Sequence, residues 1–352
     1  MSRLRWGLLS TARINERFID AVRRSDRSEL VAVASRDAQR AKAYADRFDI
    51  HSSYGTYEEL VDATNVDAVY ISLPNHLHAE WAMRLSEAGK HVFCEKPLAL
   101  TVANVDGMAQ AAQEAGVVLQ EASATRFHWQ TSDIAEIISS GRLGRILFCH
   151  ATFEFTLPAA ADIRLNPDMG GGAMWDVGCY PVAFFQAVLR ENPISAYARA
   201  VTGPTGVDLA FSGLLGYESG TAVQFTVSMA TPMARSARIV GEQGSLELDQ
   251  PWLTNTGAVA AVRQQLMRST AGAGTFGDDP DQLEEATWDY GLVDAYFDEV
   301  RGFEKLVLDG AQSPYPLSDS RMNVQVITAL HESARTGREV PIASQPAGDG
   351  RR

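Results

Sequence analysis

The chain contains 352 residues, a length that suits two domains better than one. Hydrophobic residues make up 45% and charged residues 21% of the chain, and 44 acidic against 31 basic residues give a net charge of −13. This acidic balance argues against general nucleic-acid binding and against adhesion to an anionic membrane surface.

The first residues and the cysteines indicate a compartment. The stretch "MSRLRWGLLS" has too short an apolar core for a signal peptide, and no stretch is long and apolar enough to span a membrane. The cysteines Cys94, Cys149 and Cys179 lie far apart, without a CxxC pair or a zinc-ligand spacing. We therefore expect reduced thiols, no metal site and a cytoplasmic protein.

Strand and helix patterns alternate through the first 122 residues. Apolar runs such as "LRWGLL" and "SELVAVASR" indicate buried strands, whereas "NERFIDAVRR" and "HAEWAMRLSEAG" have the apolar spacing of helices. Because the connections between them are short, the pattern predicts a doubly wound parallel sheet of the α/β Rossmann type. We expect residues 1–122 to form this first domain.

The pattern changes after this region. From "RILFCHATFEF" onward, longer alternating runs joined by turns such as "YESG" and "GEQG" predict an α+β domain with a largely antiparallel sheet over residues 123–343. Residues 254–287 are expected to be irregular, with a loop at "AGAGTFGDDPD". Helical patterns return near the end and precede a polar tail at residues 344–352.

The segment "GLLSTARIN", residues 7–15, lies where a dinucleotide-binding protein carries its glycine-rich phosphate turn. Its three glycine positions fall on Ser10, Ala12 and Asn15. The first two residues are small, and the following helix can still direct backbone amides at a pyrophosphate. The candidate cofactor residues here are Ser10, Thr11, Ala12, Arg13 and Ile14. A plain strand-to-helix connection without a ligand is the alternative.

The end of the second strand bears on which dinucleotide binds. An NAD site places a carboxylate there for the ribose 2′-hydroxyl, while an NADP site offers a cation to the 2′-phosphate. Ser35 and Arg36 occupy this position, and Arg40 follows one helical turn later. We therefore favour NADP over NAD, although Asp37 leaves open a solvated arginine at a helix start.

Five blocks occur in one order along the chain: "SLPNHLHAEWAM", "GKHVFCEKPLAL", "EASATRFH", "SGRLGRI" and "GGGAMWDVGCY". Together they resemble the Gfo/Idh/MocA oxidoreductase family, and the resemblance extends over essentially the whole chain. It implies an N-terminal Rossmann domain and a C-terminal domain whose open sheet covers the nicotinamide. It also implies a homodimer or homotetramer formed through that sheet.

The resemblance assigns site residues by position. Glu95, Lys96 and Pro97 match the family's EKP motif, in which the lysine contacts cofactor ribose and substrate and the bond before the proline is commonly cis. Asp176 and Tyr180 match the catalytic pair of D-x-G-x-[HY], here in its tyrosine form. The segment matching the nicotinamide side of the cofactor site comprises Leu73, Pro74, Asn75 and His78.

Removal of hydride from a carbinol requires a base for the hydroxyl proton. The pKa of tyrosine is ordinarily about 10, so a nearby cation must favour the phenolate, and Lys96 is the candidate. Asp176 lies four residues before Tyr180, so on an α-helix the two side chains would share a face, where the carboxylate could bind a sugar hydroxyl. The further candidate substrate residues are Arg126, Asp162, Arg164 and Trp175.

We therefore expect an NADP-dependent oxidoreductase acting on a secondary hydroxyl or ketone of a pyranose, a glycoside or a nucleotide sugar. A dihydrodiol dehydrogenase is the second interpretation, because sugars and cyclic diols present the same vicinal hydroxyl pair. A non-catalytic NADP-binding regulator is the third, supported only by the degenerate phosphate turn.

The cofactor assignment predicts that NADP(H) binds more tightly than NAD(H). Loss of one charge-assisted contact to the 2′-phosphate in Arg36→Ala should cost roughly 1.5–3 kcal/mol. Titration of both cofactors against the native protein and the variant measures this preference. Equal affinities in the native protein, or an unchanged preference in the variant, would reject the assignment.

Overall fold

The computed structural model describes residues 3–157, 162–252, 259–267, 283–292 and 294–343. The chain divides into two compact units. Residues 1–128, 161–176 and 294–324 belong to the first unit, and residues 129–160, 177–293 and 325–352 belong to the second. The expected first domain, residues 1–122, does not include the two later segments of the first unit.

The first unit contains a parallel sheet that has six strands among the described residues, in the order β3-β2-β1-β4-β5-β6. The strands are β1 (Leu4–Leu9), β2 (Ser28–Ala34), β3 (Ser52–Tyr54), β4 (Ala68–Ile71), β5 (His91–Glu95) and β6 (Leu119–Ala122). This is the strand order of the Rossmann fold, in which the order of successive strands across the sheet reverses between β1 and β4 and leaves a crevice at the carboxyl ends of the strands. The predicted α/β class is confirmed.

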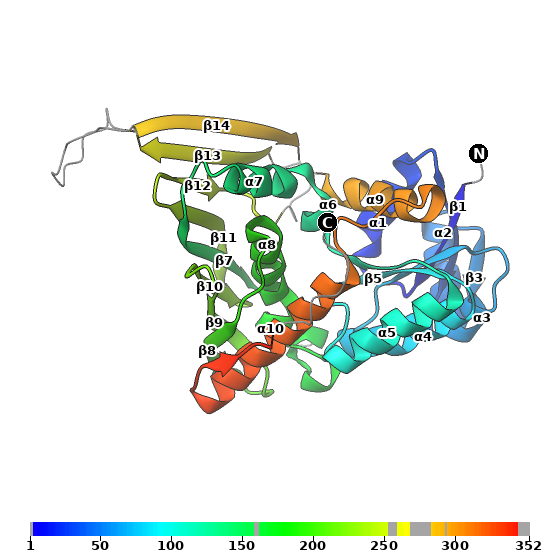
Figure 1. Ribbon diagram of the computed structural model, residues 1–352. Coiled ribbons are helices and arrows are strands. Elements are labelled where there is room, and N and C mark those ends of the chain that lie inside the picture. The colour runs from blue at the N-terminus through cyan, green and yellow to red at the C-terminus, as the bar shows by residue number, and fades with distance from the viewer. Residues whose placement is uncertain (1–2, 158–161, 253–258, 268–282, 293, 344–352) are drawn as a thin grey trace, which may run out of the picture. The chain divides into compact units, whose positions relative to one another are not determined.

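Helices cover this sheet in two layers, visible in Figure 1. They are α1 (Asn15–Arg24), α2 (Ala38–Arg47), α3 (Tyr57–Val61), α4 (His78–Glu87), α5 (Val102–Ala115), α6 (Ala124–Phe127) and α9 (Ala295–Asp309). Helix α1 buries Phe18, Ile19 and Val22, the apolar positions that predicted it. Phe18 stacks on Tyr70 at 4.0 Å between ring centroids, so α1 is fixed to the centre of the sheet.

Helix α9 joins the first unit from the far end of the chain and lies beside α1. Its residue Phe303 packs on Trp6 of β1, with ring centroids 5.0 Å apart. The buried carboxylate of Glu304 accepts hydrogen bonds from the hydroxyls of Ser25 and Ser28. These two donors satisfy a buried acceptor that would otherwise be costly to remove from water.

The second unit is built on a mixed sheet that has nine strands among the described residues, in the order β14-β13-β12-β11-β7-β10-β9-β8-β15. The strands are β7 (Ile146–Thr156), β8 (Ser195–Thr202), β9 (Asp208–Gly216), β10 (Ala222–Ser228), β11 (Ala230–Gly241), β12 (Gly244–Leu248), β13 (Val259–Met267), β14 (Leu283–Leu292) and β15 (Val340–Pro341). Among the strand pairs that the structure describes in this sheet, only β7 and β10 run parallel. The expected open, largely antiparallel sheet is confirmed.

Two strands correct the expectation for residues 254–287. Strand β13 and the first part of β14 lie in the region expected to be irregular and pair antiparallel with each other. Their sequences, "VAAVRQQLM" and "LEEATWDYGL", mix polar and apolar residues without strict alternation, so the strand signal is weak. The expected loop "AGAGTFGDDPD" and the expected tail, residues 344–352, lie outside the described residues.

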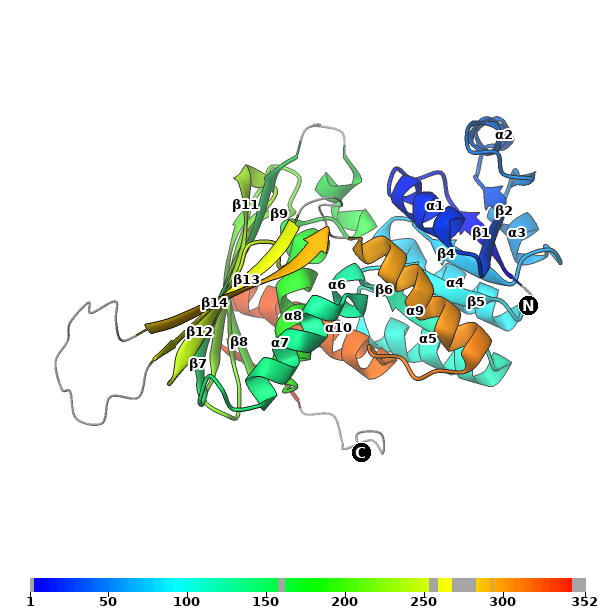
Figure 2. The ribbon, with the colours of Figure 1, turned by 90° about the horizontal axis from the view of Figure 1, so that it is seen from above.

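Strict alternation gives the central strands of this sheet one buried and one exposed face. Cys149, Ala151 and Phe153 of β7 are buried, whereas Phe148 is 37% exposed. Figure 2 shows helices α7 (Trp129–Ser139) and α8 (Cys179–Leu189) together on one side of the sheet. Helix α10 (Leu317–Thr336) begins in the first unit and ends in the second. No helix of the described chain is long and apolar enough to cross a membrane.

Candidate active site

A hollow of about 560 Å³ lies where β1, β2 and β4 end in the first unit. We call it the cofactor hollow. It is lined by Ser10, Thr11, Ala12, Ser35, Arg36, Asp37, Arg40, Tyr57, Ser72, Leu73, Pro74 and Ile163. Eight of the sequence-predicted cofactor residues line it, but Arg13, Ile14, Asn75, His78, Glu95 and Lys96 are not among the described lining residues. Tyr57 and Ile163 carried no signal in the sequence.

Side chains hold the phosphate turn in place of glycines. Ser10 has φ 130°, a conformation that favours glycine, and its hydroxyl lies 2.8 Å from the Ser72 hydroxyl. The Ser10 hydroxyl also accepts a hydrogen bond from the amide of Ala12 at 3.2 Å. Asn15, which is fully buried, donates from Nδ2 to the Ser10 carbonyl at 2.9 Å. These contacts fix a strained turn and join the ends of β1 and β4.

The end of β2 presents two cations to the cofactor hollow. Arg36 and Arg40 are both exposed at its rim, beside the buried Ser35. Asp37 caps helix α2, because its Oδ1 accepts from the Arg40 amide at 3.0 Å. Burial raises the pKa of Tyr57, and the positive charge of Arg36, which also contacts the phenol, offsets part of this rise. Two guanidinium groups and a serine hydroxyl are suitable ligands for a phosphate.

His78 lies in the interior of the first unit, beneath the loops that follow β4 and β5. It is fully buried, and its Nδ1 and Nε2 lie 2.9 Å from the carbonyl oxygens of Pro97 and Leu73, respectively. Burial lowers the pKa of this imidazole. His78 therefore joins the loop after β4 to the loop after β5, and its role is to position both loops.

Glu95 and Lys96 project into different environments at the end of β5. The hydroxyl of Tyr70 donates to Glu95, and burial raises the pKa of the Glu95 carboxyl. The peptide bond between Lys96 and Pro97 is cis. Lys96 Nζ donates to the backbone carbonyl of Asp176 at 2.7 Å and lies 3.5 Å from Asp176 Oδ1.

The Asp176 carboxylate lies between two cations. Its Oδ1 faces Lys96, and its Oδ2 is 2.8 Å from Nε of Arg164. Arg164 also lies 3.1 Å from Asp162 Oδ2, so charges alternate from Lys96 through Asp176 and Arg164 to Asp162. The side chains of Lys96 and Asp176 are each only 17% exposed, which strengthens their electrostatic interaction relative to that of surface ion pairs. Three of the predicted substrate residues therefore form one charged cluster with Lys96.

The segment around Asp176 is helical, as expected, but it is not α-helical throughout. Residues Met174–Gly178 form a π-helical turn, and the α-helix α8 begins directly after it at Cys179. π-Helical turns of this kind occur frequently at functional sites. Trp175 packs against the hydrophobic core of the first unit.

Tyr180 belongs to the second unit and is half-buried. Its ring meets Phe153 edge to face at 5.2 Å, and it lies 6.5 Å from the Trp252 ring. The indole of Trp252 donates to the carbonyl of Thr152 at 2.8 Å, which fixes this aromatic group on β7. Neighbouring aromatic rings restrict the orientation of the Tyr180 phenol.

Arg126 has structural partners in the first unit. Its guanidinium lies 2.6 Å from Asp319 Oδ2 and 4.1 Å from the centroid of the Tyr315 ring, and its side chain is only 3% exposed. Nearby, burial lowers the pKa of His128 to about 4. Because a buried ion pair of this kind is costly to break, we leave Arg126 out of the proposed substrate site.

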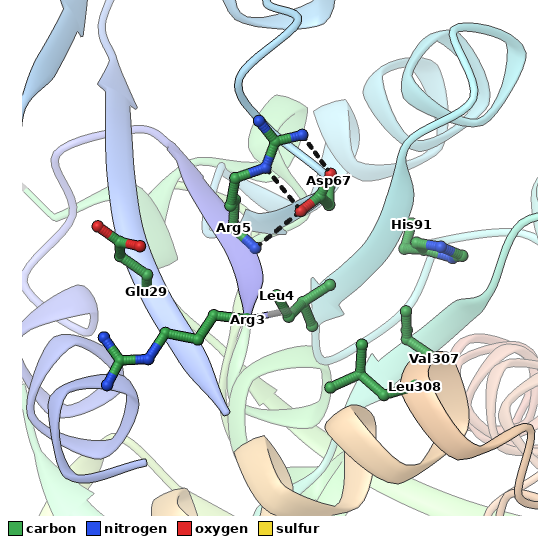
Figure 3. A pocket seen from close by; sticks show the side chains of 8 residues that line it. All are labelled: Arg3, Leu4, Arg5, Glu29, Asp67, His91, Val307 and Leu308. Atoms are coloured by element: carbon green, nitrogen blue, oxygen red, sulfur yellow. Dashed lines mark hydrogen bonds and ion pairs between the residues drawn. The ribbon is translucent and has the colours of Figure 1, made fainter. Parts of the chain in front are cut away.

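A second hollow lies at the opposite end of the parallel strands (Figure 3). Its lining comprises Arg3, Leu4, Arg5, Glu29, Asp67, His91, Val307 and Leu308. In Figure 3 the guanidinium of Arg5 faces the Asp67 carboxylate, and the shortest of their contacts is 2.6 Å. Ligands of open parallel sheets bind at the carboxyl ends of the strands, whereas this hollow lies at the amino ends. Among the described residues, no group of His, Cys, Asp and Glu is arranged to hold a metal ion.

The strained turn yields a testable pair of variants. Ser10→Gly and Ser10→Ala both remove the hydroxyl, but only glycine adopts the positive φ without strain. We expect Ser10→Gly to be more stable than Ser10→Ala by about 1 kcal/mol, measured by chemical unfolding. Dinucleotide affinity of the glycine variant should stay within about tenfold of native, because backbone amides dominate pyrophosphate binding. Equal stability of the variants, or lost binding in Ser10→Gly, would contradict this account.

Comparison with known proteins identifies the family of the chain. Residues 4–123 match the oxidoreductase family with an NAD-binding Rossmann fold, and residues 131–247 match the Gfo/Idh/MocA C-terminal domain. The D-xylose 1-dehydrogenase (NADP⁺) 2 of Haloferax volcanii is 34% identical over 339 residues, covering 96% of this chain and 99% of the relative. The trans-1,2-dihydrobenzene-1,2-diol dehydrogenase of Xenopus laevis is 32% identical over 69% of this chain and 74% of its own length.

A solved structure is also similar. The 3-ketoreductase of Actinomadura kijaniata, in complex with NADP and TDP-benzene, aligns with a TM-score of 0.84 at 27% identity, covering 94% of this chain and 98% of that chain. The two matched regions together span most of the sequence. The chain therefore belongs to the Gfo/Idh/MocA oxidoreductase family.

Proposed function

We propose that the protein is an NADP-dependent oxidoreductase that interconverts a secondary hydroxyl and a ketone on a pyranose, a glycoside or a nucleotide sugar. The observation that carries this proposal is the charged cluster in which Asp176 lies between Lys96 and Arg164. Such a cluster offers both donors and acceptors to the hydroxyl groups of a polyol. The relatives are dehydrogenases and reductases, which supports an enzyme acting on CH–OH groups and disfavours a non-catalytic regulator.

The residues at the end of β2 support NADP as the cofactor. Arg36, Arg40 and Ser35 can hold a 2′-phosphate, while Asp37, the one carboxylate among the described lining residues, is used as a helix cap. The xylose dehydrogenase relative carries NADP⁺ in its name, and the similar ketoreductase structure contains NADP. When bound, the nicotinamide supplies the acceptor or donor of hydride.

We assign the proton transfer to Tyr180 and the support of that transfer to Lys96. A tyrosine serves as a base near neutral pH when a cation favours its phenolate, and an ammonium group supplies such a charge. Asp176 holds Lys96 through its backbone carbonyl, so the ammonium group has a defined position. Asp176, Arg164 and Asp162 are the proposed ligands of the neighbouring sugar hydroxyls.

The second candidate substrate is a cyclic trans-diol. The 32% identity with the dihydrodiol dehydrogenase of Xenopus laevis favours it. A cyclic diol presents the vicinal hydroxyl pair of a pyranose without the ring oxygen or the remaining hydroxyls. A sugar should therefore benefit from Asp162 and Arg164, whereas a plain diol needs fewer polar partners.

We further propose a homodimer or homotetramer assembled through the exposed face of the second sheet. Phe148 and Leu214 on this face are 37% and 38% exposed, and Val201 is 64% exposed. The strand register places Gln224 between Leu214 and His150, so polar side chains lie among the apolar ones on this face. Exposed large apolar side chains surrounded by polar residues are typical of a protein interface.

The buried cysteines support a reducing compartment. Cys94, Cys149 and Cys179 are all buried, and none of them forms a disulfide with another. Secreted proteins rarely retain several free cysteines, because oxidising compartments favour disulfides. We therefore propose that the enzyme acts in the cytoplasm.

The proton assignment predicts the effect of Tyr180→Phe, which keeps the ring and removes only the hydroxyl. The rate of hydride transfer should fall by about 10²–10⁴ while cofactor affinity stays nearly unchanged. Lys96→Met should also slow the step and shift the surviving pH–rate profile to higher pH, because the tyrosine pKa rises without the cation. Single-turnover measurements across pH on the native enzyme, both variants and the double variant test this.

The rate of hydride transfer in the double variant should fall much less than the two single effects combined would predict, since both residues act on one proton. Near-native turnover by Tyr180→Phe would remove Tyr180 from the mechanism. Activity against a cyclic diol that exceeds activity against every pyranose tested would favour the second candidate substrate.

The interface proposal predicts that Phe148→Glu lowers the molecular mass in solution, because a buried carboxylate opposes association. Sedimentation equilibrium of native and variant protein measures the mass. Gln39→Glu, on an exposed residue of helix α2, is the control that adds the same single negative charge. A monomeric native protein, or a Phe148→Glu variant with unchanged mass, would count against this interface.

A further inference from the structure

An isoleucine from a distant part of the chain lines the cofactor hollow. Ile163 follows the parallel sheet by some forty residues, yet it belongs to the first unit and borders the same hollow as Ser35, Arg36 and Arg40. The side chain of this residue is 53% exposed, so part of it is accessible to a ligand in the hollow. An apolar group facing a nucleotide site is suited to the face of a base or a ribose.

Residues 162–172, which we call the strap, hold Ile163 in this position. The strap contains two short 3-10 turns, η2 (Ile163–Leu165) and η3 (Pro167–Met169). The amide of Gly172 donates to the Arg164 carbonyl at 2.9 Å, closing the strap on itself. A Cβ on Gly171 would lie only 2.4 Å from that carbonyl oxygen, so the chain packs too closely there for any other residue.

The strap is also fixed to the rest of the first unit. Asn75 Nδ2 donates to the Gly170 carbonyl at 2.9 Å, which links the strap to the segment after β4. Arg164 reaches Asp176 at 2.8 Å. Consecutive strap residues therefore contact two sites. Ile163 borders the cofactor hollow, while Arg164 holds the carboxylate of Asp176, a proposed ligand of the substrate.

We propose that Ile163 binds the adenosine half of the dinucleotide and that the strap couples its occupancy to the position of Asp176. The proposal rests on the proposed NADP function, since the ligand of the hollow is that cofactor. When the adenosine packs on Ile163, it fixes the position of the strap. The fixed strap then keeps Arg164 in contact with the Asp176 carboxylate. By reciprocity, Arg164 and Asp176 contribute to cofactor affinity although neither is among the described lining of the hollow.

The test is direct titration of NADPH by fluorescence, without any sugar substrate. Ile163→Ala should weaken binding about fivefold, because covering the exposed half of an isoleucine contributes that much. Ile163→Ala should also bind 2′-phospho-ADP-ribose, which lacks the nicotinamide, more weakly than the native protein does, by the same factor. Ile194→Ala is the matched control, since Ile194 is 47% exposed but belongs to the second unit. It should bind both ligands like the native protein.

A double-variant cycle tests the coupling. Arg164→Met should weaken NADPH binding about threefold in the native background and hardly at all in the Ile163→Ala background. Unchanged NADPH affinity in Ile163→Ala, or equal losses from Arg164→Met in both backgrounds, would overturn the inference. A native protein that does not bind NADPH would overturn the proposed cofactor and this inference together. NADPH binding as expected without sugar turnover would leave the inference supported and reject only the proposed reaction.

Discussion

The proposed site depends on the carboxylate of Asp176, which neutralises two cations at once. Lys96 Nζ lies 3.5 Å from one oxygen and Arg164 Nε 2.8 Å from the other. Without this carboxylate, an ammonium and a guanidinium group would face each other in a partly buried position, which is electrostatically unfavourable. The ion pairs therefore join three segments of the first unit, namely the end of β5, the strap and the π-helical turn.

The phosphate turn shows how a dinucleotide fingerprint can be replaced without glycine. The first glycine position retains the backbone that glycine would adopt, and the serine tolerates φ 130° because its hydroxyl is bonded to Ser72 and Ala12. The third position carries Asn15, which is large, but its amide bonds the Ser10 carbonyl within the turn. Side-chain hydrogen bonds thus stabilise a turn that the backbone freedom of glycine permits in the usual motif.

Much of the fold could be predicted because its signals are local. Helix α1 runs from Asn15 to Arg24, as the sequence "NERFIDAVRR" predicted, since its apolar spacing is regular. Strands β13 and β14 were missed because they mix polar and apolar residues irregularly. The role of Ile163 could not be predicted either, because its place at the cofactor hollow depends on tertiary packing far from the Rossmann sequence.

The candidate site, too, could be predicted only in part. Lys96, Asp176 and Arg164 could each be chosen from sequence, but the order of their contacts required coordinates. Arg126 resembled a substrate ligand until its partner appeared in Asp319, 193 residues later in the chain. A π-helical turn at Asp176 has no sequence signature comparable to a helix cap, so the helix there could be predicted but its π-helical first turn could not.

Transfer of deuterium from a labelled substrate tests the central claim most directly. A pyranose carrying deuterium on the carbon that bears the reacting hydroxyl is incubated with the enzyme and NADP⁺, and the reduced nicotinamide is analysed by mass spectrometry. The account predicts deuterium on the nicotinamide ring in amounts equal to the ketone formed, with a primary isotope effect on the single-turnover rate. Binding of NADP⁺ without transfer of deuterium from any pyranose or cyclic diol would contradict it.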